Sequence, residues 1–432
     1  MRWEPRDFQK DLESDPARFV CAVVHRRAGK TVYAVNWLLE PAEDDSFPYE
    51  PGYRGYYVCP YAGQARDIAL EYFQLMATGY PKINRSRLTL EWDHGAVVQL
   101  VGTEYNVQKH RGKLADRVLF DETPHIAPSA WTDVFRPMLS DRRDEFQEWC
   151  IERGHAPNQG LFIGTPNGRL NQFYKFFELG NNPDFPEWSS HFVPADQSGI
   201  IDDQELALLK AEIGDRAYER EMLCSFDAGA AGSFFEDEMA EAAESRRIVP
   251  FEYVGGEVFT SWHFGPSSLT VVWITADGRG RHVFFKAQRF ENAKVEDVCK
   301  YVTSQKQYHY GRHYAGGPKL KANDARVQIA RDNGIRFLLV ENQQMSDAAA
   351  RVKSKLGRCV FSESMAADLI EGMRTVHAAY DEELGTFTEK AVEDVAYELS
   401  MPIVHFFGGH NDKRSDWSKP IDYNTRGKRR AA

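Results

Sequence analysis

Apolar residues in the first half of the chain fall into short runs of β-branched and aromatic residues, separated by longer stretches with a helical pattern. Such runs are apolar on both sides of the backbone, as in the strands of a parallel sheet that helices cover on both faces. The pattern therefore predicts an α/β domain between residues 18 and 225. Its expected strands are 19–24, 55–59, 97–101, 117–120 and 160–163.

A stretch of small residues at 227–233 interrupts this periodicity, and a second α/β pattern follows it. A run of Gly and Ala favours a linker over a packed element. The second pattern predicts strands at 257–261, 269–274, 282–287 and 336–340. We expect four parts: a first domain over 1–228, a linker over 229–250, a second domain over 251–410 and a basic tail over 411–432.

The composition agrees with two ordinary globular domains, since 42% of the 432 residues are hydrophobic and 27% are charged. No apolar run approaches the roughly 18 residues that a membrane span needs, and the N-terminus lacks the apolar core of a signal peptide. We therefore expect an intracellular protein without a membrane contact. The six cysteines form no C-x-x-C pair, which argues against a zinc site or a disulfide framework and favours buried thiols.

The net charge of -11 argues against a protein that nucleic acid coats evenly, because phosphate contacts need an excess of Lys and Arg. A local basic track remains open. The tail at 411–432 carries seven Lys or Arg and three Asp. It is interpreted either as a solvated end of the chain or as a contact for DNA or a partner.

The segment 19–31 joins an apolar strand to a turn of basic and small residues and then to an amphipathic stretch. A strand, a tight turn and a helix N-terminus point backbone N–H groups at a phosphate. Lys30 would add a point charge, and Thr31 a hydroxyl for Mg²⁺. Val24 stands where the full P-loop pattern has glycine, and a chance turn is the alternative. The predicted ATP-binding residues of this loop are Arg26, Arg27, Ala28, Gly29, Lys30 and Thr31.

A second motif, at 116–122, is an apolar strand that ends in the acids Asp121 and Glu122. A P-loop ATPase needs one carboxylate to hold the metal and often a second to polarise the attacking water, both beside the loop. Asp121 fits the metal role together with Thr31, and Glu122 fits the catalytic role. The alternative is an acid that caps the next helix.

Three further residues fall where such a site would use them. A Gln amide can pair with the donor and acceptor edge of adenine, so Gln9 is a candidate nucleotide-binding residue. Thr165 follows the strand at 160–163, in a polar turn placed to sense the γ-phosphate. Arg136 is a candidate arginine finger that would reach the phosphates of a neighbouring subunit.

In this order, the motifs resemble those of tailed-bacteriophage terminase large subunits. The matching motifs are HRRAGKT at 25–31, YVCP at 57–60, HRG at 110–112, DE at 121–122, FIGTPNGR at 162–169 and EMLCSFD at 221–227. The resemblance implies a P-loop NTPase motor domain followed by an RNase H-like α/β nuclease domain. It also implies ATP and Mg²⁺ as cofactors and viral double-stranded DNA as the substrate. Expected partners are a portal protein and a small terminase subunit, with the chain forming a homo-oligomeric ring in the host cytoplasm, transiently docked on the procapsid.

The second domain matches the family in layout but departs from it in chemistry. The family's nuclease holds two Mg²⁺ or Mn²⁺ ions on three carboxylates. Asp324 is a credible metal ligand, whereas His263 and Met401 stand at or near the other two expected positions. A thioether is a poor ligand for a hard cation, and imidazole favours softer metals. We therefore expect an endonuclease-type domain with reduced or no cleavage activity.

Other residues of this domain leave two interpretations open. His263 is either a hydrogen-bonded core histidine or a ligand for Mn²⁺. Asp394 and Glu398 are four residues apart, so on a helix they would share a face. They are either an ordinary solvated face or substitutes for the missing carboxylates.

Two alternatives to a packaging motor remain at this stage. The same phosphate-binding machinery would serve a helicase-like DNA-dependent ATPase that separates strands. A degenerate terminase homologue that only binds DNA or a portal is the other. Strand displacement distinguishes the first from a packaging motor, and ATP turnover distinguishes the second.

Overall fold

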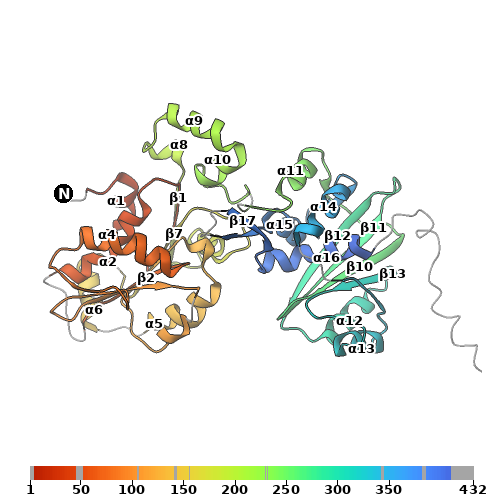
Figure 1. Cartoon of the computed structure of the whole chain (residues 1–432), viewed down its shortest axis with the longest axis horizontal. Coiled ribbons are helices and arrows are strands. Elements are labelled where there is room, and N and C mark those ends of the chain that lie inside the picture. The colour runs from red at the N-terminus through yellow and green to blue at the C-terminus, as the bar shows by residue number, and fades with distance from the viewer. Residues whose placement is uncertain are drawn as a thin grey trace, which may run out of the picture. The chain divides into compact units, whose positions relative to one another are not determined.

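The computed structural model describes residues 4–44, 52–104, 107–140, 144–154, 156–228, 230, 232–341, 345–381 and 386–409. The basic tail expected at 411–432 lies outside these residues. The chain divides into two compact units, Met1–Ala228 and Gly229–Ala432, which run from red to green and from green to blue in Figure 1. Each unit has its own sheet and is described by itself.

The first unit is built on an eight-stranded sheet, counted within the described residues, with the order β3-β4-β5-β2-β6-β7-β1-β8. Strands β5, β2, β6, β7, β1 and β8 pair in parallel, and β3 and β4 add an antiparallel hairpin at one edge. The strands are β1 (Phe19–Val24), β2 (Arg54–Cys59), β3 (Lys82–Asn84), β4 (Thr89–Glu91), β5 (Val97–Gly102), β6 (Arg117–Asp121), β7 (Gln159–Gly164) and β8 (Trp188–Val193).

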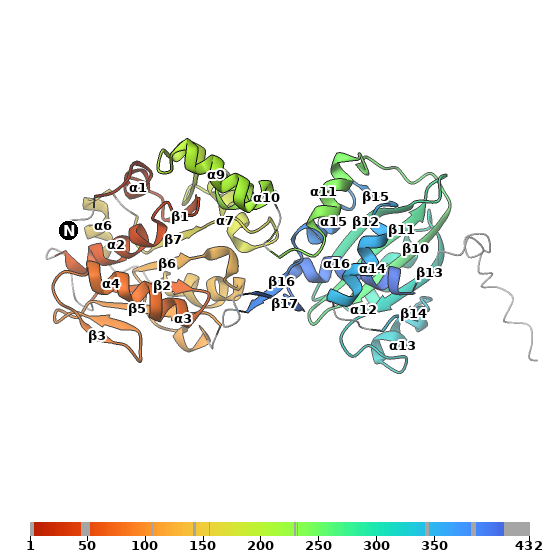
Figure 2. The same ribbon diagram turned by 45° about the horizontal axis from the view of Figure 1, so that its top comes forward.

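Both faces of this sheet are buried. Val20 and Val24 of β1 join one apolar cluster, and Phe19 and Val23 join another on the opposite face. Side chains of successive strand residues point to opposite faces, so a strand between two apolar layers must be apolar at every position. Continuous apolar runs therefore became the central strands here, as Figure 2 shows for β1, β6 and β7.

Helices cover both faces of the sheet. Helices α2 and α4 supply side chains to the first cluster, and η4 and α7 to the second. The helical segments are α1 (Asp7–Glu13), α2 (Lys30–Glu43), α3 (Ala62–Gln64), η1 (Ala65–Ala69), α4 (Leu70–Met76), η2 (Val107–His110), η3 (Thr123–His125), η4 (Ala130–Phe135), α5 (Arg136–Met138), α6 (Asp144–Glu152), α7 (Gln172–Gly180), α8 (Ala195–Ser198), α9 (Asp203–Ile213) and α10 (Asp215–Glu221).

The second unit contains a sheet of the order β14-β13-β10-β11-β12-β15-β9 within the described residues. Strands β10, β11 and β12 pair antiparallel, and β13 and β14 continue the sheet in parallel from β10. The strands are β9 (Ile248–Val249), β10 (Glu257–Phe264), β11 (Ser268–Ala276), β12 (His282–Glu291), β13 (His309–Gly316), β14 (Phe337–Leu339), β15 (Cys359–Ser362), and the separate pair β16 (Ala378–Asp381) and β17 (Thr386–Ala391).

Helix α16 packs across β10, β11 and β13 of this sheet, so its residues are buried along most of its length. The opposite face carries an apolar cluster that includes Trp262 of β10 and Val298 of α12. The helices of this unit are α11 (Glu236–Glu244), α12 (Val295–Ser304), α13 (Ala325–Asp332), α14 (Met345–Leu356), α15 (Ala367–Thr375) and α16 (Val395–Gly409).

The structure corrects the linker expected at 229–250. Helix α11 and strand β9 both lie in that range, and β9 pairs with β15 at the edge of the second sheet. Met239 and Ala242 of α11 are buried, so this helix is a packed element of the second unit. The Gly and Ala residues at 228–232 predicted an interruption of the pattern but not where it ends.

The predicted mixed α/β class is confirmed, and each strand range expected from the apolar pattern coincides with a strand to within a few residues. The pattern missed β8, β13 and β15 and the short strands β3, β4, β9, β16 and β17. All six cysteines are buried free thiols, as expected. Among the described helices, none combines the length and apolar character that crossing a bilayer requires.

Candidate functional site

Strands β6, β7 and β1 are neighbours in the first sheet and run in parallel, so their carboxyl ends lie along one edge. The loop at 25–29 follows β1, Glu122 follows β6, and Thr165 follows β7. Ligands of open α/β sheets bind at this kind of edge. Three motifs that lie far apart in the sequence therefore meet at one place.

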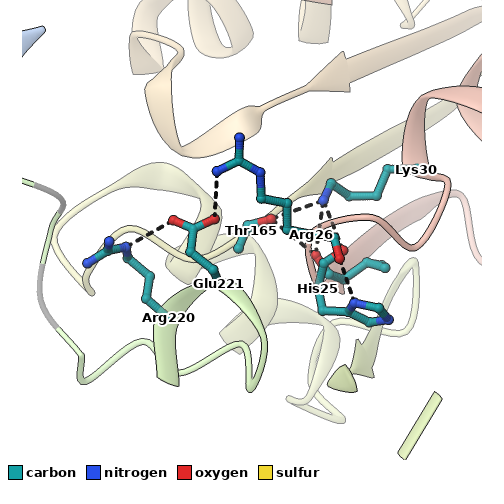
Figure 3. A network of polar contacts seen from close by, with 7 residues as sticks. His25, Arg26, Lys30, Thr165, Arg220 and Glu221 are labelled. Carbon is teal, nitrogen blue, oxygen red and sulfur yellow. Dashed lines mark hydrogen bonds and ion pairs between the residues drawn. The ribbon is translucent and has the colours of Figure 1, made fainter. Parts of the chain in front are cut away.

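Lys30 is the cation at the centre of this edge. Its Nζ donates to the carbonyl oxygen of His25 at 3.1 Å, to that of Val24 at 3.3 Å and to the Thr165 hydroxyl at 3.0 Å. Thr165 in turn donates to the Val24 carbonyl at 3.2 Å. Figure 3 shows Lys30 turned toward Thr165 and the backbone of the loop. All these partners are neutral, and within the described residues Lys30 forms no ion pair.

Asp121 is the acid of this edge and is almost fully buried. Its Oδ2 accepts a hydrogen bond from the Tyr57 hydroxyl and lies 3.4 Å from the Thr31 hydroxyl. Its Oδ1 accepts the backbone N–H of Glu122 at 3.0 Å. Burial and the nearby Glu122 raise the pKa of Asp121 to about 6, although the Tyr57 hydrogen bond and the charge of Lys30 lower it. In the described part of the chain, this carboxylate thus lies beside Thr31 without an ion-pair partner.

Glu122 has a strained backbone, with φ +53° and ψ +45° in the left-handed region. This conformation costs a non-glycine residue about 1–3 kcal/mol and tends to persist at functional sites. Glu122 precedes the 3₁₀ turn η3 but makes no side-chain cap, so the helix-cap alternative fails in its simple form. Its side chain is half-buried at the end of β6, next to Asp121.

The remaining loop residues divide by exposure. Ala28 is buried, Arg26 and Arg27 are exposed, and Arg27 also has a left-handed φ of +70°. Arg26 donates its backbone N–H to the carbonyl oxygen of Glu221 at 2.9 Å, and its guanidinium lies 3.8 Å from the Glu221 carboxylate. Arg220 contacts the same carboxylate at 3.2 Å, as drawn in Figure 3. The end of α10 is therefore attached to the loop.

Gln9 contacts the loop and is buried, not exposed at an open base site. Its side-chain N–H donates to the Gly29 carbonyl at 3.1 Å, and its side-chain oxygen accepts the backbone N–H of Arg6 at 2.8 Å. The Arg6 guanidinium donates to the Ala28 carbonyl at 2.7 Å. Each polar atom of the Gln9 amide makes one hydrogen bond within the chain, and the side chain is buried, so the expected adenine contact stays a prediction that would require α1 to move.

Arg136 lies at the opposite end of β1 from the loop. Its guanidinium sits 5.1 Å from the centre of the Phe19 ring, where β1 begins, and donates to the Ser140 hydroxyl at 3.2 Å. It cannot serve its own subunit's loop from there, because β1 spans about 3.3 Å per residue. A role toward a neighbouring subunit stays a prediction.

The donor set fits ATP with Mg²⁺. A buried ammonium and two amides at the start of α2 suit phosphate oxygens, while a hydroxyl and a carboxylate 3.4 Å apart are hard oxygen ligands that suit Mg²⁺. The residues that would hold the metal are Thr31 and Asp121. Those that would hold the phosphates are Lys30 and the loop amides.

The position expected for the first nuclease carboxylate is occupied by His263, on β10 of the second unit. His263 is buried on β10, and its Nδ1 lies 3.1 Å from Nε2 of His405 on α16. The His405 ring lies against Gly316, whose added Cβ would come within 2.4 Å of it. Burial lowers the pKa of His263 to about 4 and that of His405 well below its usual value, so both are neutral at pH 7. His263 is a core histidine, as one of the two interpretations had it.

Asp324 is a helix cap and an ion-pair partner. It accepts the backbone N–H of Arg326 at 2.8 Å, and both of its oxygens receive the Arg326 guanidinium, at 3.0 and 2.8 Å. This pairing holds the pKa of Asp324 below its usual value. No group of three His, Cys, Asp or Glu side chains in the described part of the chain could hold a metal ion. The expected metal role of Asp324 thus finds no such set of ligands around it.

Glu398 of α16 is also neutralised, which corrects its interpretation as part of a solvated face. It is buried, and one oxygen accepts both the Ser268 hydroxyl at 2.6 Å and the Arg289 guanidinium at 2.7 Å. Met401, further along the same helix, is fully buried. The donor set here does not fit a pair of Mg²⁺ or Mn²⁺ ions, because Asp324 and Glu398 already carry arginine partners.

No protein-family model and no curated protein matches the chain. Its structural neighbours are large terminases of bacteriophages. The HK97 bacteriophage large terminase is 13% identical over 95% of each chain, with a TM-score of 0.46. The large terminase of a thermophilic bacteriophage is 13% identical over 93% of this chain and 98% of that one, with a TM-score of 0.41. The ATPase domain of the Thermus phage P74-26 large terminase is 20% identical over 52% of this chain and 94% of that one, with a TM-score of 0.40. At these identities and scores, an argument for function rests on the side chains described above.

Three residues of the candidate nucleotide site were missed as contributors: Arg6, Tyr57 and Glu221. Tyr57 and Glu221 lie in motifs that the sequence singles out, but none of the three has a motif role of its own. Tyr57 belongs to the predicted strand at 55–59 and could have been found from its parallel neighbour β6, because Tyr57 pairs with Leu119. The contacts of Arg6 and Glu221 with the loop carry no spacing signal.

Proposed function

We propose that the first unit hydrolyses ATP and that the chain is a terminase large subunit, the motor that translocates viral double-stranded DNA into a procapsid. One observation carries the proposal. The buried Lys30 and Asp121 lie at the same sheet edge, each held by neutral donors or acceptors and neither paired with the other. A cation and an acid kept apart in this way suit a phosphate and its metal.

The proposed roles follow the contacts. Lys30 and the amides that open α2 bind the phosphates, and Thr31 and Asp121 hold Mg²⁺, which when bound neutralises phosphate charge during transfer. Glu122 orients and deprotonates the attacking water beside them. Thr165 donates to the Val24 carbonyl and accepts from Lys30, so a change at Lys30 on phosphate loss reaches β7.

Two substitutions test the ATPase assignment. Lys30→Ala and Glu122→Gln should each abolish DNA-stimulated ATP hydrolysis while leaving the circular dichroism and thermal unfolding of the chain unchanged. Lys82→Ala is a matched control, because Lys82 is exposed and its ion pair with Asp93 lies at the surface. Wild-type hydrolysis in either site variant would remove the assignment.

The alternatives give different outcomes in the same preparation. A packaging motor translocates along duplex DNA without separating it, whereas a helicase-like ATPase displaces a labelled strand. A degenerate homologue that only binds DNA or a portal turns over no ATP at all. We expect ATP turnover without strand displacement.

Assembly belongs to the same proposal. We propose a homo-oligomeric ring on a portal protein, supplied with DNA by a small terminase subunit, in which Arg136 acts on a neighbouring subunit's phosphates. Mixing Arg136→Ala with Glu122→Gln subunits should restore part of the hydrolysis that each lacks, since intact Glu122 and intact Arg136 then meet at some interfaces. The absence of any recovery, with both variants assembling, would contradict the role in trans.

For the second unit, we propose an RNase H-like domain without metal-dependent cleavage. The carboxylates Asp324 and Glu398 are each paired with an arginine, and the first expected position is filled by His263. A supercoiled plasmid should remain intact with Mg²⁺ or Mn²⁺. Robust nicking that Asp324→Ala removes would contradict this proposal and leave the ATPase assignment untouched.

A further inference from the structure

We infer that helix α1 positions the phosphate-binding amides: Arg6 and Gln9 hold the carbonyl side of the loop so that its N–H groups face the nucleotide, and Gln9 does not select the base. The inference rests on the proposed nucleotide site. It assigns a role to Arg6, and it replaces the adenine contact expected of Gln9.

The contacts lie between side chains at the start of α1 and two successive carbonyls of the loop. Arg6 donates to the Ala28 carbonyl at 2.7 Å, and Gln9 donates to the Gly29 carbonyl at 3.1 Å. Gln9 is itself fixed, because its side-chain oxygen accepts the Arg6 backbone N–H at 2.8 Å. The Gln9 amide keeps one N–H and one lone pair, but its side chain is only 2% exposed, so a base could not reach them without displacing the contacts around Gln9.

The geometry of the peptide bond means that these carbonyl contacts also fix where the N–H groups of the loop point. In a planar trans peptide, the C=O of one residue and the N–H of the next point in opposite directions. The Ala28 carbonyl shares its peptide plane with the Gly29 N–H, and the Gly29 carbonyl shares its plane with the Lys30 N–H. Fixing both carbonyls toward α1 therefore fixes both N–H groups away from it.

The backbone of this turn requires glycine at position 29. Its φ of +90° is open mainly to glycine, whereas an added Cβ would only make ordinary contacts, 3.5 Å from the Gln9 amide nitrogen and 3.7 Å from the Arg6 guanidinium. The Gly29 carbonyl also accepts the Tyr33 N–H at 3.2 Å, the first bond of α2. The first turn of the phosphate-binding helix and α1 thus share one acceptor.

The electrostatics agree with an orienting role. A guanidinium bound to a carbonyl makes a charge-assisted bond, stronger than one between neutral groups. The Ala28 residue that it holds is fully buried, so this carbonyl has limited access to replacement water. Loss of Arg6 should leave the loop free to rotate these peptide planes, which weakens phosphate binding whatever the base.

The test compares ATP and GTP in the full-length chain. Arg6→Ala and Gln9→Ala should each lower kcat/KM about tenfold for both nucleotides, leaving the ratio of ATP to GTP as in the wild type. Arg6→Lys, which keeps a cationic donor, should recover most of the loss. Lys10→Ala is the matched control on the same helix, because Lys10 is exposed and pairs with Asp7, which is exposed as well. This substitution should leave kcat/KM unchanged for both nucleotides.

A second measurement needs no hydrolysis. Hydrogen exchange of the Tyr33 amide, which donates to the Gly29 carbonyl, should speed up in the nucleotide-free Arg6→Ala and Gln9→Ala chains, with α2 beyond its first turns unchanged. A shift in the ATP to GTP ratio for Gln9→Ala would establish base reading and overturn the inference. Wild-type exchange and kinetics in both variants would overturn it as well. Faster exchange in a chain that hydrolyses no ATP would support the positioning role while removing the proposed function.

Discussion

The two units treat charged side chains in opposite ways. At the edge of the first sheet, Lys30 contacts neutral oxygens, and Asp121 has no ion-pair partner among the described residues. In the second unit, Asp324 is paired with Arg326 and Glu398 with Arg289. In the first arrangement the charges remain available for a ligand to neutralise, whereas in the second they are neutralised within the chain.

The comparison indicates when a carboxylate can bind a ligand and when it cannot. A buried carboxylate without a partner costs free energy until a ligand arrives, whereas an arginine removes that cost permanently and occupies the lone pairs that a metal would use. Both regions contain acidic residues, so the number of acids does not distinguish them. They differ in the groups that contact those acids, and the following experiments measure the energetic effect of that difference.

Breaking the ion pair between Glu398 and Arg289 in the second unit should have the largest effect on stability. Glu398→Ala removes the acceptor of the Ser268 hydroxyl and leaves Arg289 with only the exposed Glu291 as a carboxylate partner, and should destabilise the unit by about 3–5 kcal/mol. Hydrogen exchange of the β10 and β11 amides measures this loss. The control Glu296→Ala removes a carboxylate from an exposed pair with Lys300 in the same unit, and should leave the stability nearly unchanged. Equal effects of the two substitutions would remove the contrast.

Replacing Asp121, the acid of the first unit without an ion-pair partner, by a neutral residue should increase the stability of the unit. The pKa of Asp121 rises from 3.8 to about 6 on folding, so the folded chain holds its proton more tightly, and the stability this gives below pH 4 is lost as pH rises through 6. Asp121→Asn should therefore stabilise the first unit by on the order of 3 kcal/mol at pH 8. At pH 4 the gain should fall below about 1 kcal/mol. Denaturant unfolding at both values checks the difference, and a constant gain would contradict the cause.

The neutral histidines of the second unit give the smallest of these effects. The pKa of His263 falls from 6.5 to about 4 on folding, so the unfolded chain takes up a proton first, and stability present above pH 6.5 is lost as pH falls toward 4. His263→Gln, which keeps a hydrogen-bonding group beside His405, should reduce the loss between pH 7 and pH 5 by about 2 kcal/mol. The unfolding curves at the two pH values should lie closer together for the variant than for the wild type, although His405 and His313 still contribute to the acid loss. An unchanged acid loss would place the titration elsewhere.

Much of the fold could be predicted from the sequence. The apolar runs at 19–24 and 117–120 predicted central parallel strands because they are almost continuously apolar, and they became β1 and β6. Strand β8 was missed because its residues are only partly buried at the sheet edge, so WSSHFV carries no continuous apolar signal. Strand β13, with HYGRHYAG, lacks such a signal in the second unit as well.

The residue types of the candidate site could be predicted from the sequence, but the contacts between them could not. Lys30, Thr31, Asp121 and Thr165 were expected together because each lies at or after the end of a predicted strand, and parallel strand ends share an edge. Gln9 was expected to face a base, yet its amide is held by the backbone of Arg6 and Gly29. Nothing in the spacing of α1 and the loop says which side of the helix faces them, since a seven-residue helix has too few turns to mark a face.

By itself the sequence determined the two α/β halves and the strands that carry the phosphate-binding motifs, because these depend on residue type and local periodicity. Only the tertiary structure decided that Asp324 and Glu398 pair with arginines while Asp121 contacts neutral groups, and that Arg6 and Gln9 contact the carbonyls of the loop. Those outcomes depend on which side chains meet across the fold, and charge compensation acts over a few ångströms whatever the separation along the chain.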